Sequence, residues 1–514
     1  MESEPVAEPV AERGVVLSLD EGTTGATAIA VGMDGQVRGK GYAEIEQHYP
    51  QPGWVEHDAE EIWSAVQRTA GEALDAAGAK PADVRAIGIT NQRETLVVWD
   101  RKTLKPLSRA IVWQDRRTAS ECTRLREAGH EDRVREVTGL VLDPYFTATK
   151  LAWVMANVVG AASAAVGTVD SWLVARLSAG RDHVTDASNA SRTLLFDIDR
   201  GVWSDEMAAL FGVPLANLPE VRDSSGEISH SDPAVFGGID APITGIAGDQ
   251  QAALFGQACT TIGMAKNTYG TGSFVLRQTG AHRVPSKSGM LTTVAWQRDG
   301  SLSYALEGSI FITGAALQWL RDGLGIIGSA AEAGPLAASV PDSGGVFLVP
   351  AFVGLGAPYW DPYARGTIVG LTRGTGRAQI VRAAVEAMAY QTSDVVEAME
   401  RDTGEPLREL RVDGGAAVMD VLCQFQADLL GIPVSRPRQT ETTALGAAFL
   451  AGLGAGLWAD GDLKELWKLD REFEPAMSRD QAGSLQAEWR RALERSRNWV
   501  TGAAGSPRRT RDNQ

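Results

Sequence analysis

One carboxylate and two glycine–threonine turns are the groups in this sequence whose types and spacing could do chemistry. Asp249 follows Gly248 at the end of an apolar stretch over 243–247, and it opens the helical run Ala252–Phe255. A carboxylate at the turn from a strand to a helix lies at the carboxyl edge of a sheet, where α/β proteins bind ligands. Taken by itself, Asp249 could equally serve only as the N-cap of that helix.

Each half of the chain carries its own glycine–threonine turn between apolar stretches, Asp20–Thr24 in the first half and Tyr269–Ser273 in the second. The hydroxyls of Thr23 and Thr24, beside backbone N–H groups, suit phosphate oxygens. Asp20 is a candidate for holding Mg²⁺, usually through water. A plain polar hairpin turn is the alternative. A carboxylate between two candidate phosphate turns indicates phosphoryl transfer.

Composition narrows the class of protein. The chain has 514 residues and 44% hydrophobic content, which predicts at least two large domains. The net charge of −16 argues against a nucleic-acid surface or an anionic membrane as a partner. Its three cysteines are far apart and fit free thiols in a reducing cytosol. The longest uncharged apolar stretch, Ala444–Ala459, is shorter than the ~18 residues of a membrane span, so we expect a soluble cytoplasmic protein.

Around the first turn, apolar stretches predict strands over 14–20 and 26–33, and a further buried strand over 84–90 with 95–99 as its partner. Arg93 and Glu94 lie between the last two. In an extended strand adjacent side chains point to opposite faces, so both reach one ligand only if the chain turns there. Otherwise they form a solvated pair that contributes little.

Two aromatic residues and a capping pattern complete the first half. Trp113 ends a short strand over 111–113, and Tyr145 lies in a turn before a helix. For Tyr145, core packing and a ligand wall are both open. Asp58, with Glu61 three residues later, resembles a capping box at a helix N-terminus.

The second half restarts with strand, turn and strand over 266–277, a weak repeat of 15–31. A helix predicted over 309–321 carries Gly314 and Gln318 on one face. A strand over 410–412 stops at Asp413-Gly-Gly415, and a helix over 419–430 follows. Such a unit presents N–H groups and a positive helix end where a nucleotide could bind, although a Gly-Gly pair alone is a weak signal.

With these stretches in hand, the chain resembles the FGGY carbohydrate kinases of the actin-like ATPase superfamily over about 16–499. The motifs that carry the resemblance are Pro52–Asp58, Gly88–Thr95, Asp143–Phe146, Gly248–Gly256, Asn267–Gly272, Gly356–Pro362 and the run Gly366–Glu386. The sequences Asn91-Gln-Arg-Glu-Thr95 and Gly248-Asp-Gln-Gln-Ala-Ala253 resemble the glycerol branch of that family.

The resemblance implies an α/β fold of two ribonuclease-H-like (actin-like ATPase) domains around a central cleft. It implies transfer of the ATP γ-phosphoryl group to glycerol, with Mg²⁺, by a homodimer or homotetramer. We therefore expect a polyol- and phosphate-binding domain over 14–256 and a nucleotide-binding domain over 257–500. Their composition predicts that residues 1–13 and 501–514 are disordered tails.

By position, the resemblance makes Asp249 the base that accepts the hydroxyl proton. The contacts to the glycerol hydroxyls would be Arg93, Glu94, Tyr145, Asp249 and Gln250, with Trp113 and Phe274 as the apolar wall. The phosphate contacts would be Thr23, Thr24 and Thr271, the other nucleotide contacts Gly314, Gln318, Gly415 and Met419, and the Mg²⁺ site Asp20.

The chain departs from the family pattern at the first phosphate turn, which normally reads Asp-Gln-Gly-Thr-Thr-Ser-Ser-Arg. Glu21 replaces the glutamine, Gly25-Ala26 the two serines, and Thr27 the arginine. Met419 stands where an asparagine is usual. Loss of the arginine removes a charge-assisted contact worth ~1.5–3 kcal/mol, which predicts weaker ATP binding.

Two alternatives to glycerol phosphorylation remain at this point. One is a kinase of the same fold that acts on another polyol or a ketose. The other is a nucleotide-binding regulatory protein that keeps the cleft but transfers little phosphate.

Overall fold

The computed structural model of the chain describes residues 14–500. The predicted tails over 1–13 and 501–514 lie outside the described residues. The first half contains a hairpin of β1 (Val15–Glu21) and β2 (Gly25–Gly32), extended by β3 (Val37–Glu44). β5 (Val84–Asn91) pairs with β1 in parallel, and β14 (Pro242–Gly248) pairs with β5 in parallel. The strand order is therefore β3-β2-β1-β5-β14.

The second half repeats this arrangement. It contains β15 (Ala265–Tyr269), β16 (Ser273–Gly280), β18 (Ser301–Ile310), β21 (Leu410–Asp413) and β22 (Val434–Pro437) in the order β18-β16-β15-β21-β22. In both halves the first three strands are antiparallel and the last two are added in parallel. The repeat predicted between 15–31 and 266–277 is thus confirmed, and it supplies the two halves of an actin-like ATPase fold.

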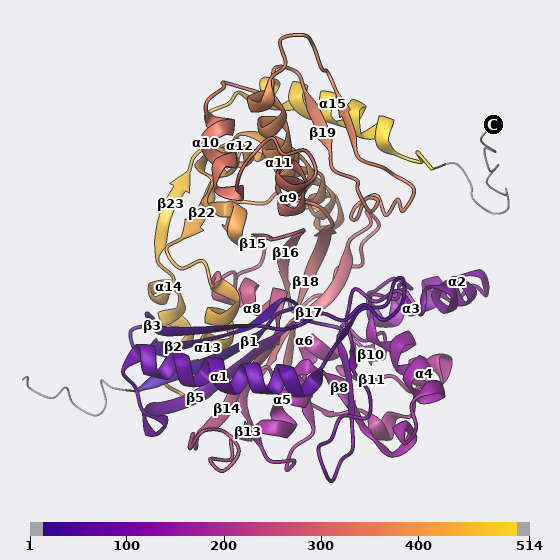
Figure 1. Cartoon of the computed structure of the whole chain (residues 1–514), viewed down its shortest axis with the longest axis vertical. Helices are drawn as coiled ribbons and strands as arrows, with labels where there is room; N and C mark the ends of the chain where they lie inside the picture. The colour runs from indigo at the N-terminus through magenta and orange to yellow at the C-terminus, as the bar shows by residue number, and fades with distance from the viewer. Residues whose placement is uncertain (1–13, 501–514) are drawn as a thin grey trace, which may run out of the picture.

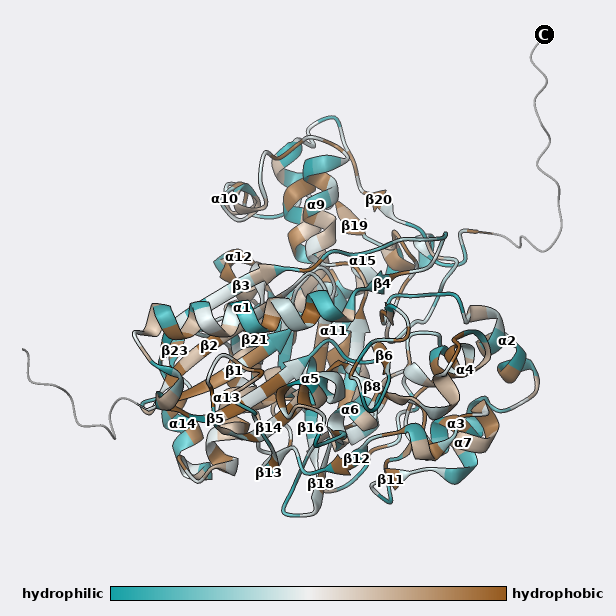
Figure 2. Cartoon of the chain, turned by 60° about the horizontal axis from the view of Figure 1, so that its bottom comes forward, coloured by the Kyte–Doolittle hydropathy of each residue, from teal (hydrophilic) through white to brown (hydrophobic). Residues whose placement is uncertain are grey.

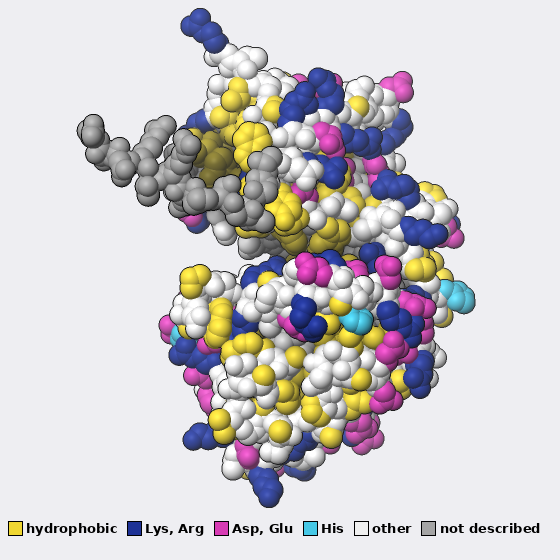
Figure 3. Space-filling model, turned by 90° about the vertical axis from the view of Figure 1, so that its right-hand side faces the viewer, with side chains coloured by type: hydrophobic (Ala, Val, Ile, Leu, Met, Phe, Trp, Pro, Cys, Tyr) yellow, Lys and Arg dark blue, Asp and Glu magenta, His cyan; other side chains and the backbone are white. Residues whose placement is uncertain are grey.

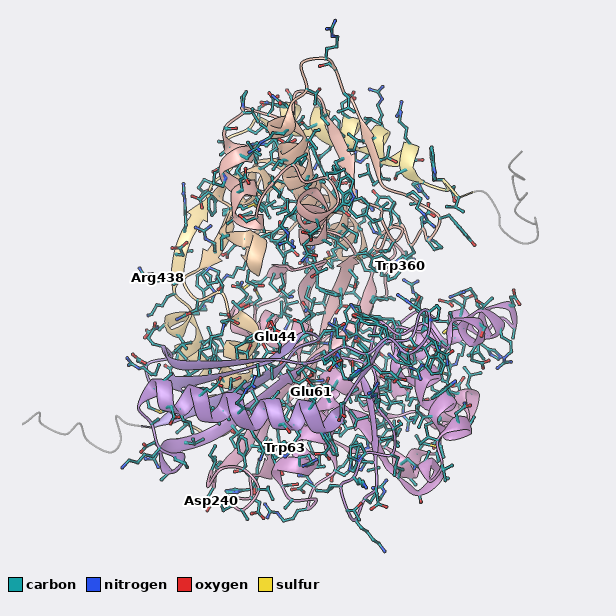
Figure 4. The ribbon with its side chains drawn as sticks, in the orientation of Figure 1. Glu44, Glu61, Trp63, Asp240, Trp360 and Arg438 are labelled. Carbon is teal, nitrogen blue, oxygen red and sulfur yellow. The ribbon has the colours of Figure 1, made fainter. Side chains whose placement is uncertain are left out.

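A hairpin of the second half joins the two sheets. β17 (Leu291–Arg298) and β18 are antiparallel neighbours, and β17 also lies beside β13 (Ser225–His230) of the first half, where Ser225 pairs with Arg298. One sheet of thirteen strands results. In Figure 1 the strands β15, β16 and β18 lie between an upper part, formed mostly by the second half of the chain, and a lower part, formed mostly by the first half. Figure 3 shows the surface indented between these two parts.

Helices connect many of the strands in both halves. Those of the first half are α1 (Ala59–Ala77), α2 (Ala119–Glu127), α3 (Glu131–Thr138), α4 (Thr147–Asn157), α5 (Val169–Leu177), α6 (Ala187–Ala190), α7 (Asp205–Phe211) and α8 (Asp249–Gly256). Those of the second half are α9 (Gly314–Asp322), α10 (Ala333–Ala338), α11 (Arg377–Thr403), α12 (Asp420–Leu430), α13 (Thr442–Gly454), α14 (Leu463–Leu466) and α15 (Arg479–Ser496).

The remaining strands form small sheets or edges. They are β4 (Glu56–His57), β6 (Leu96–Trp99), β7 (Ala110–Ile111) and β8 (Ala165–Thr168) in one sheet; the pairs β9 (Val184–Asp186) with β12 (Glu220–Arg222), β10 (Phe196–Asp197) with β11 (Val202–Trp203), and β19 (Phe347–Val349) with β20 (Thr367–Val369); and the edge strand β23 (Leu469–Phe473).

Helix α13 belongs to the second half of the chain but packs on the sheet of the first. The hydroxyl of Ser18 in β1 donates to the Ala444 carbonyl over 2.7 Å. Glycines permit the close crossing of α13 with α8, since a Cβ atom on Gly446 would lie 1.8 Å from the Ala252 carbonyl oxygen. Figure 2 shows the brown helix α13 beside β5 and β14, where apolar faces meet. The two halves are therefore interlocked.

Three expectations about local structure are wrong. The segment predicted over 95–99 forms β6 but pairs with β8, not with β5. The helix predicted over 309–321 begins only at Gly314, because β18 continues to Ile310. Asp58 does cap α1, but Glu61 accepts the N–H of Glu46 instead of closing a capping box.

Two further expectations concern cysteines and the membrane. The three cysteines are all free and buried. Among the helices of residues 14–500, none combines the length and the apolar character that crossing a bilayer requires.

Candidate active site

Asp249 begins α8 directly after β14, as predicted. Its Oδ1 accepts the backbone N–H of Gln250 over 2.7 Å. The side chain is 30% exposed, so a ligand can reach the carboxylate. Gly248 is required here because a Cβ atom at this position would lie 2.7 Å from the Arg93 side chain.

Arg93 lies against this carboxylate and is itself buried. Its Nε is 3.0 Å from Oδ1 of Asp249. Its Nη1 and Nη2 donate to the two carboxylate oxygens of Glu307 over 2.5 and 3.2 Å. Burial by itself favours a neutral carboxyl, but the guanidinium groups of Arg192 and Arg93 outweigh it and hold the pKa of Glu307 at about 2. Arg93 is thereby fixed between two carboxylates.

Glu94 reaches the same site because the chain turns, which was the condition for the pair to share a ligand. β5 ends at Asn91, and Glu94 has a φ of 64°. Its Oε1 accepts from Nε of Arg192 over 2.6 Å. Burial raises the pKa of Glu94, whereas Arg192 and Arg93 oppose that shift.

Three aromatic side chains line this region. The Tyr145 hydroxyl is 3.5 Å from Nη2 of Arg93. The rings of Tyr145 and Trp113 meet nearly at right angles with centroids 5.4 Å apart. The Phe274 ring lies under Arg93, with its centroid 5.7 Å from the guanidinium carbon. The structure therefore brings these residues together around Arg93.

Gln250 is oriented by a buried lysine that sequence reasoning missed. Lys266 in β15 donates to Oε1 of Gln250 over 2.5 Å and to the Thr268 hydroxyl over 2.8 Å. Because an ammonium group only donates, the amide NH₂ of Gln250 is left to face a ligand as a donor. Burial lowers the pKa of Lys266 to about 8, opposed by the carboxylates of Asp413 and Asp249.

The first glycine–threonine turn is joined to this site through Trp113. The indole N–H of Trp113 donates to the Thr23 hydroxyl over 2.8 Å. The neighbouring Thr24 is exposed. Asp20, near the end of β1, is half-buried: desolvation and the carboxylates of Asp249 and Glu441 raise its pKa to about 8.

Glu21 lies beneath the same turn and is fully buried. Both its carboxylate oxygens accept from Nε2 of Gln92, over 3.0 and 3.1 Å. Burial raises the pKa of Glu21 well above its usual range. The acid that replaces the family's glutamine is therefore held away from the surface of the turn.

The second glycine–threonine turn sits on the N-terminus of α9. The backbone N–H of Gly314 donates to the Gly270 carbonyl over 3.0 Å, and that of Ala315 to the Thr271 carbonyl over 3.0 Å. A Cβ atom on Gly314 would lie 2.6 Å from the Gly270 oxygen. The side chains of Thr271 and, one helical turn along, Gln318 are exposed.

Gly415 and Met419 follow β21. Gly415 is exposed and faces open space, so nothing in residues 14–500 blocks the approach of a ligand. Met419 is different: its side chain is 7% exposed and lies against Gly334 in α10. The structure thus places Gly415 at the surface but turns Met419 into the protein.

Glu307, Arg192 and Lys266 were not predicted from the sequence. Each is a fully buried charge inside an otherwise apolar or small-residue stretch, which is a signal that could have been read, because a buried charge requires a partner. Two cavities of about 410 and 530 Å³ lie elsewhere, the first beside Arg135 and Arg283 and the second beside Trp319 and Phe352.

Comparison with known proteins decides the family. The models for the N-terminal and C-terminal domains of the FGGY family of carbohydrate kinases match residues 15–256 and 265–455. The chain belongs to the FGGY family of carbohydrate kinases. It is 58% identical to a glycerol kinase of Dechloromonas aromatica, over 94% of this chain and 98% of the relative. It is 55% identical to a glycerol kinase of Deinococcus radiodurans, over 95% and 99%.

Solved structures agree with this membership. A glycerol kinase of Plasmodium falciparum, crystallised with ADP, is 34% identical and superimposes with a TM-score of 0.88 over 94% of this chain and 98% of that chain. A xylulose kinase of Lactobacillus acidophilus superimposes with a TM-score of 0.82 over 94% of this chain and 97% of that chain. Because its identity is 19%, it supports the fold alone.

Proposed function

We propose that this protein transfers the γ-phosphoryl group of ATP to glycerol, giving sn-glycerol 3-phosphate and ADP. The observation that carries the proposal is the exposed face of the Asp249 carboxylate, held 3.0 Å from Arg93 beside Glu94, Tyr145 and Gln250. Relatives that are 55–58% identical over nearly their whole length and are named glycerol kinase support the same activity.

In the proposed reaction Asp249 accepts the proton of the attacking glycerol hydroxyl. The hydroxyl oxygen forms a bond to the γ-phosphorus, and the bond from that phosphorus to the bridging oxygen of ADP breaks. Phosphoryl transfer needs positioning and charge neutralisation more than covalent help from the protein. The amide NH₂ of Gln250 donates to a hydroxyl whose own proton is directed to Asp249.

The other hydroxyls are held by charged and aromatic partners. Arg93 and Tyr145 donate and Glu94 accepts, so an analogue that lacks one hydroxyl leaves a buried protein group unpaired. Trp113 and Phe274 form the wall beneath the carbon chain. This pattern suits a small neutral polyol.

For ATP, we propose that the two glycine–threonine turns hold the phosphates through Thr23, Thr24 and Thr271. Gly314, Gln318 and Gly415 contact the rest of the nucleotide. Met419 occupies the position of a further nucleotide contact, where the family usually has an asparagine. Its side chain is buried and could only pack against the nucleotide, without a hydrogen bond. This arrangement supports the expectation of weaker ATP binding.

We propose Asp20 as the residue that holds Mg²⁺. The donor chemistry fits, because the carboxylates of Asp249 and Glu441 lie near this half-buried carboxyl, and a bound cation would offset their combined negative charge. Within residues 14–500 no hydrogen bond is made to this side chain. The ion, when bound, would neutralise charge on the triphosphate.

We also propose the functional division of the chain into 14–256 for the polyol and 257–500 for the nucleotide, with closure of the two halves excluding water. The acidic net charge and the three buried thiols support a cytoplasmic enzyme. A homodimer or homotetramer is proposed from the family resemblance.

The proposal is tested by ADP release from the purified protein with glycerol, dihydroxyacetone, erythritol and xylulose in parallel. Glycerol should give the highest kcat/KM. If another polyol or a ketose gives a higher kcat/KM, that compound and not glycerol is the preferred substrate. If the protein binds ATP tightly but turns over none of the four compounds, it is a regulatory protein. The departures at Glu21 and Thr27 lie at the phosphate turn, so they do not favour a change of acceptor.

A further inference from the structure

Five charged side chains, all buried except Asp249, form an alternating chain at the predicted polyol site. Asp249 contacts Arg93, Arg93 contacts Glu307, Glu307 contacts Arg192, and Arg192 contacts Glu94. The two carboxylates at the ends of this chain are the ones expected to meet the substrate. Its centre, Glu307, was in no sequence prediction.

We propose that Glu307 is a positioning residue that fixes both charged ends of the polyol site, and that Arg192 is the link to Glu94. The inference rests on the proposed function and deepens it. One carboxylate accepts from Arg93 over 2.5 and 3.2 Å and from Arg192 over 3.0 Å. Arg192 in turn holds Glu94 over 2.6 Å. A single side chain therefore sets the positions of Arg93 directly and of Glu94 through Arg192.

Glu307 is well placed for such a role because its backbone cannot move freely. It lies in β18, between Leu276 of β16 and Leu291 of β17. The next residue, Gly308, is so close to α11 that a Cβ atom would lie 2.4 Å from the Val395 side chain. The carboxylate therefore projects from the rigid centre of the sheet.

The charges also depend on one another. Removing the carboxylate at the centre leaves two buried guanidinium groups whose remaining charged partners are Asp249 and Glu94, the acids expected to face the substrate. Arg93 then pairs more fully with Asp249, and Arg192 with Glu94, which withdraws both acids from the ligand. Nη1 of Arg192 is buried and lacks a protein partner within residues 14–500, so one donor of the network remains for a water or a ligand hydroxyl.

The test is Glu307→Gln, with initial rates measured while glycerol and ATP are varied separately and glycerol affinity measured by tryptophan fluorescence. We expect the KM and Kd of glycerol to rise about tenfold or more, because Arg93 and Glu94 would no longer be held in the positions that bind the glycerol hydroxyls. The KM of ATP should stay within about twofold. Glu386→Gln is the matched control: Glu386 in α11 is also buried and accepts from Arg382 over 2.6 Å, but outside the site. It should leave glycerol KM unchanged.

If Glu307→Gln does not fold, the Arg192→Lys variant tests the same positioning role. One ammonium group cannot hold Glu94 and Glu307 together as the forked guanidinium does. The same glycerol-specific loss is expected. Unchanged glycerol affinity, or equal loss for glycerol and ATP, overturns the positioning role. If the wild-type protein binds glycerol but does not phosphorylate it, the proposed function is wrong. The fluorescence titration would still test the role of Glu307, because it compares the glycerol affinity of the wild-type protein and the variant.

Discussion

The indole N–H of Trp113 donates to the Thr23 hydroxyl over 2.8 Å, so a hydrogen bond joins the proposed wall of the polyol site to the proposed phosphate turn. Because the Thr23 oxygen accepts from Trp113, its own hydrogen is free to donate to a phosphate oxygen. In the proposed reaction, the groups that hold glycerol and ATP would therefore be direct neighbours.

Thr23→Val is expected to raise the KM of ATP about tenfold, because a hydrogen bond to a charged phosphate is lost and the indole N–H is left unpaired. Trp113→Phe removes the same hydrogen bond from the other side. A double-mutant cycle on kcat/KM for ATP measures the coupling. Strictly additive effects of the two substitutions would show that the hydrogen bond does not position Thr23.

Lys266→Met should raise the KM of glycerol several-fold with little change for ATP, because the amide of Gln250 loses the donor that fixes which end faces the ligand. Initial rates with each substrate varied separate these effects. An increase confined to the KM of ATP would instead assign Lys266 to the phosphates.

Asp20 gives a prediction about pH. Its folded pKa, about 8, lies above the unfolded value of 3.8, so the folded protein binds the extra proton between these values. Stability without ligand should therefore fall as pH rises from about 4 to about 8, and Asp20→Asn should remove that part of the dependence. Urea unfolding of both proteins across this range measures it. A stability difference that does not grow toward pH 8 would contradict the pKa assignment.

The same substitution tests the metal site. Asp20→Asn should raise the Mg²⁺ concentration for half-maximal activity about tenfold, since the carboxylate that offsets the ion's charge is gone. Asp34→Asn is the control. Asp34 is an exposed acid in the turn between β2 and β3, where it is paired with Arg38. Equal responses of the two variants would remove Asp20 from the metal site.

Thr27→Arg should lower the KM of ATP about tenfold by restoring a charge-assisted phosphate contact. Thr27 is paired with Asp20 across β1 and β2, so both side chains project from the same face of the hairpin. Rates with ATP varied at saturating glycerol test this. No gain in ATP affinity would show that the departure from the family pattern carries no cost.

Much of the architecture could be predicted because it follows local patterns. Asp249 at a strand–helix turn and the two glycine–threonine hairpins stand in the structure as expected. Pairing between distant segments could not be predicted: 95–99 joins a separate sheet, and β18 reaches Ile310 where a helix was expected.

The prediction of the site was incomplete because it, too, depends on contacts between distant segments. Glu307 is brought under Arg93 only because β17 and β18 of the second half extend the sheet of the first. Nothing in the local sequence around Glu307 specifies that neighbour. A charge in an apolar strand signals that a partner exists, but the fold decides which one.

The most direct test of the central claim is glycerol-dependent ADP release by Asp249→Asn, with binding of glycerol and ATP checked on the same sample. We predict that kcat falls about 10²- to 10⁴-fold while both ligands still bind, because the amide cannot accept the hydroxyl proton. A kcat within tenfold of the wild-type value, with the fold intact, would contradict the assignment of Asp249 as the base.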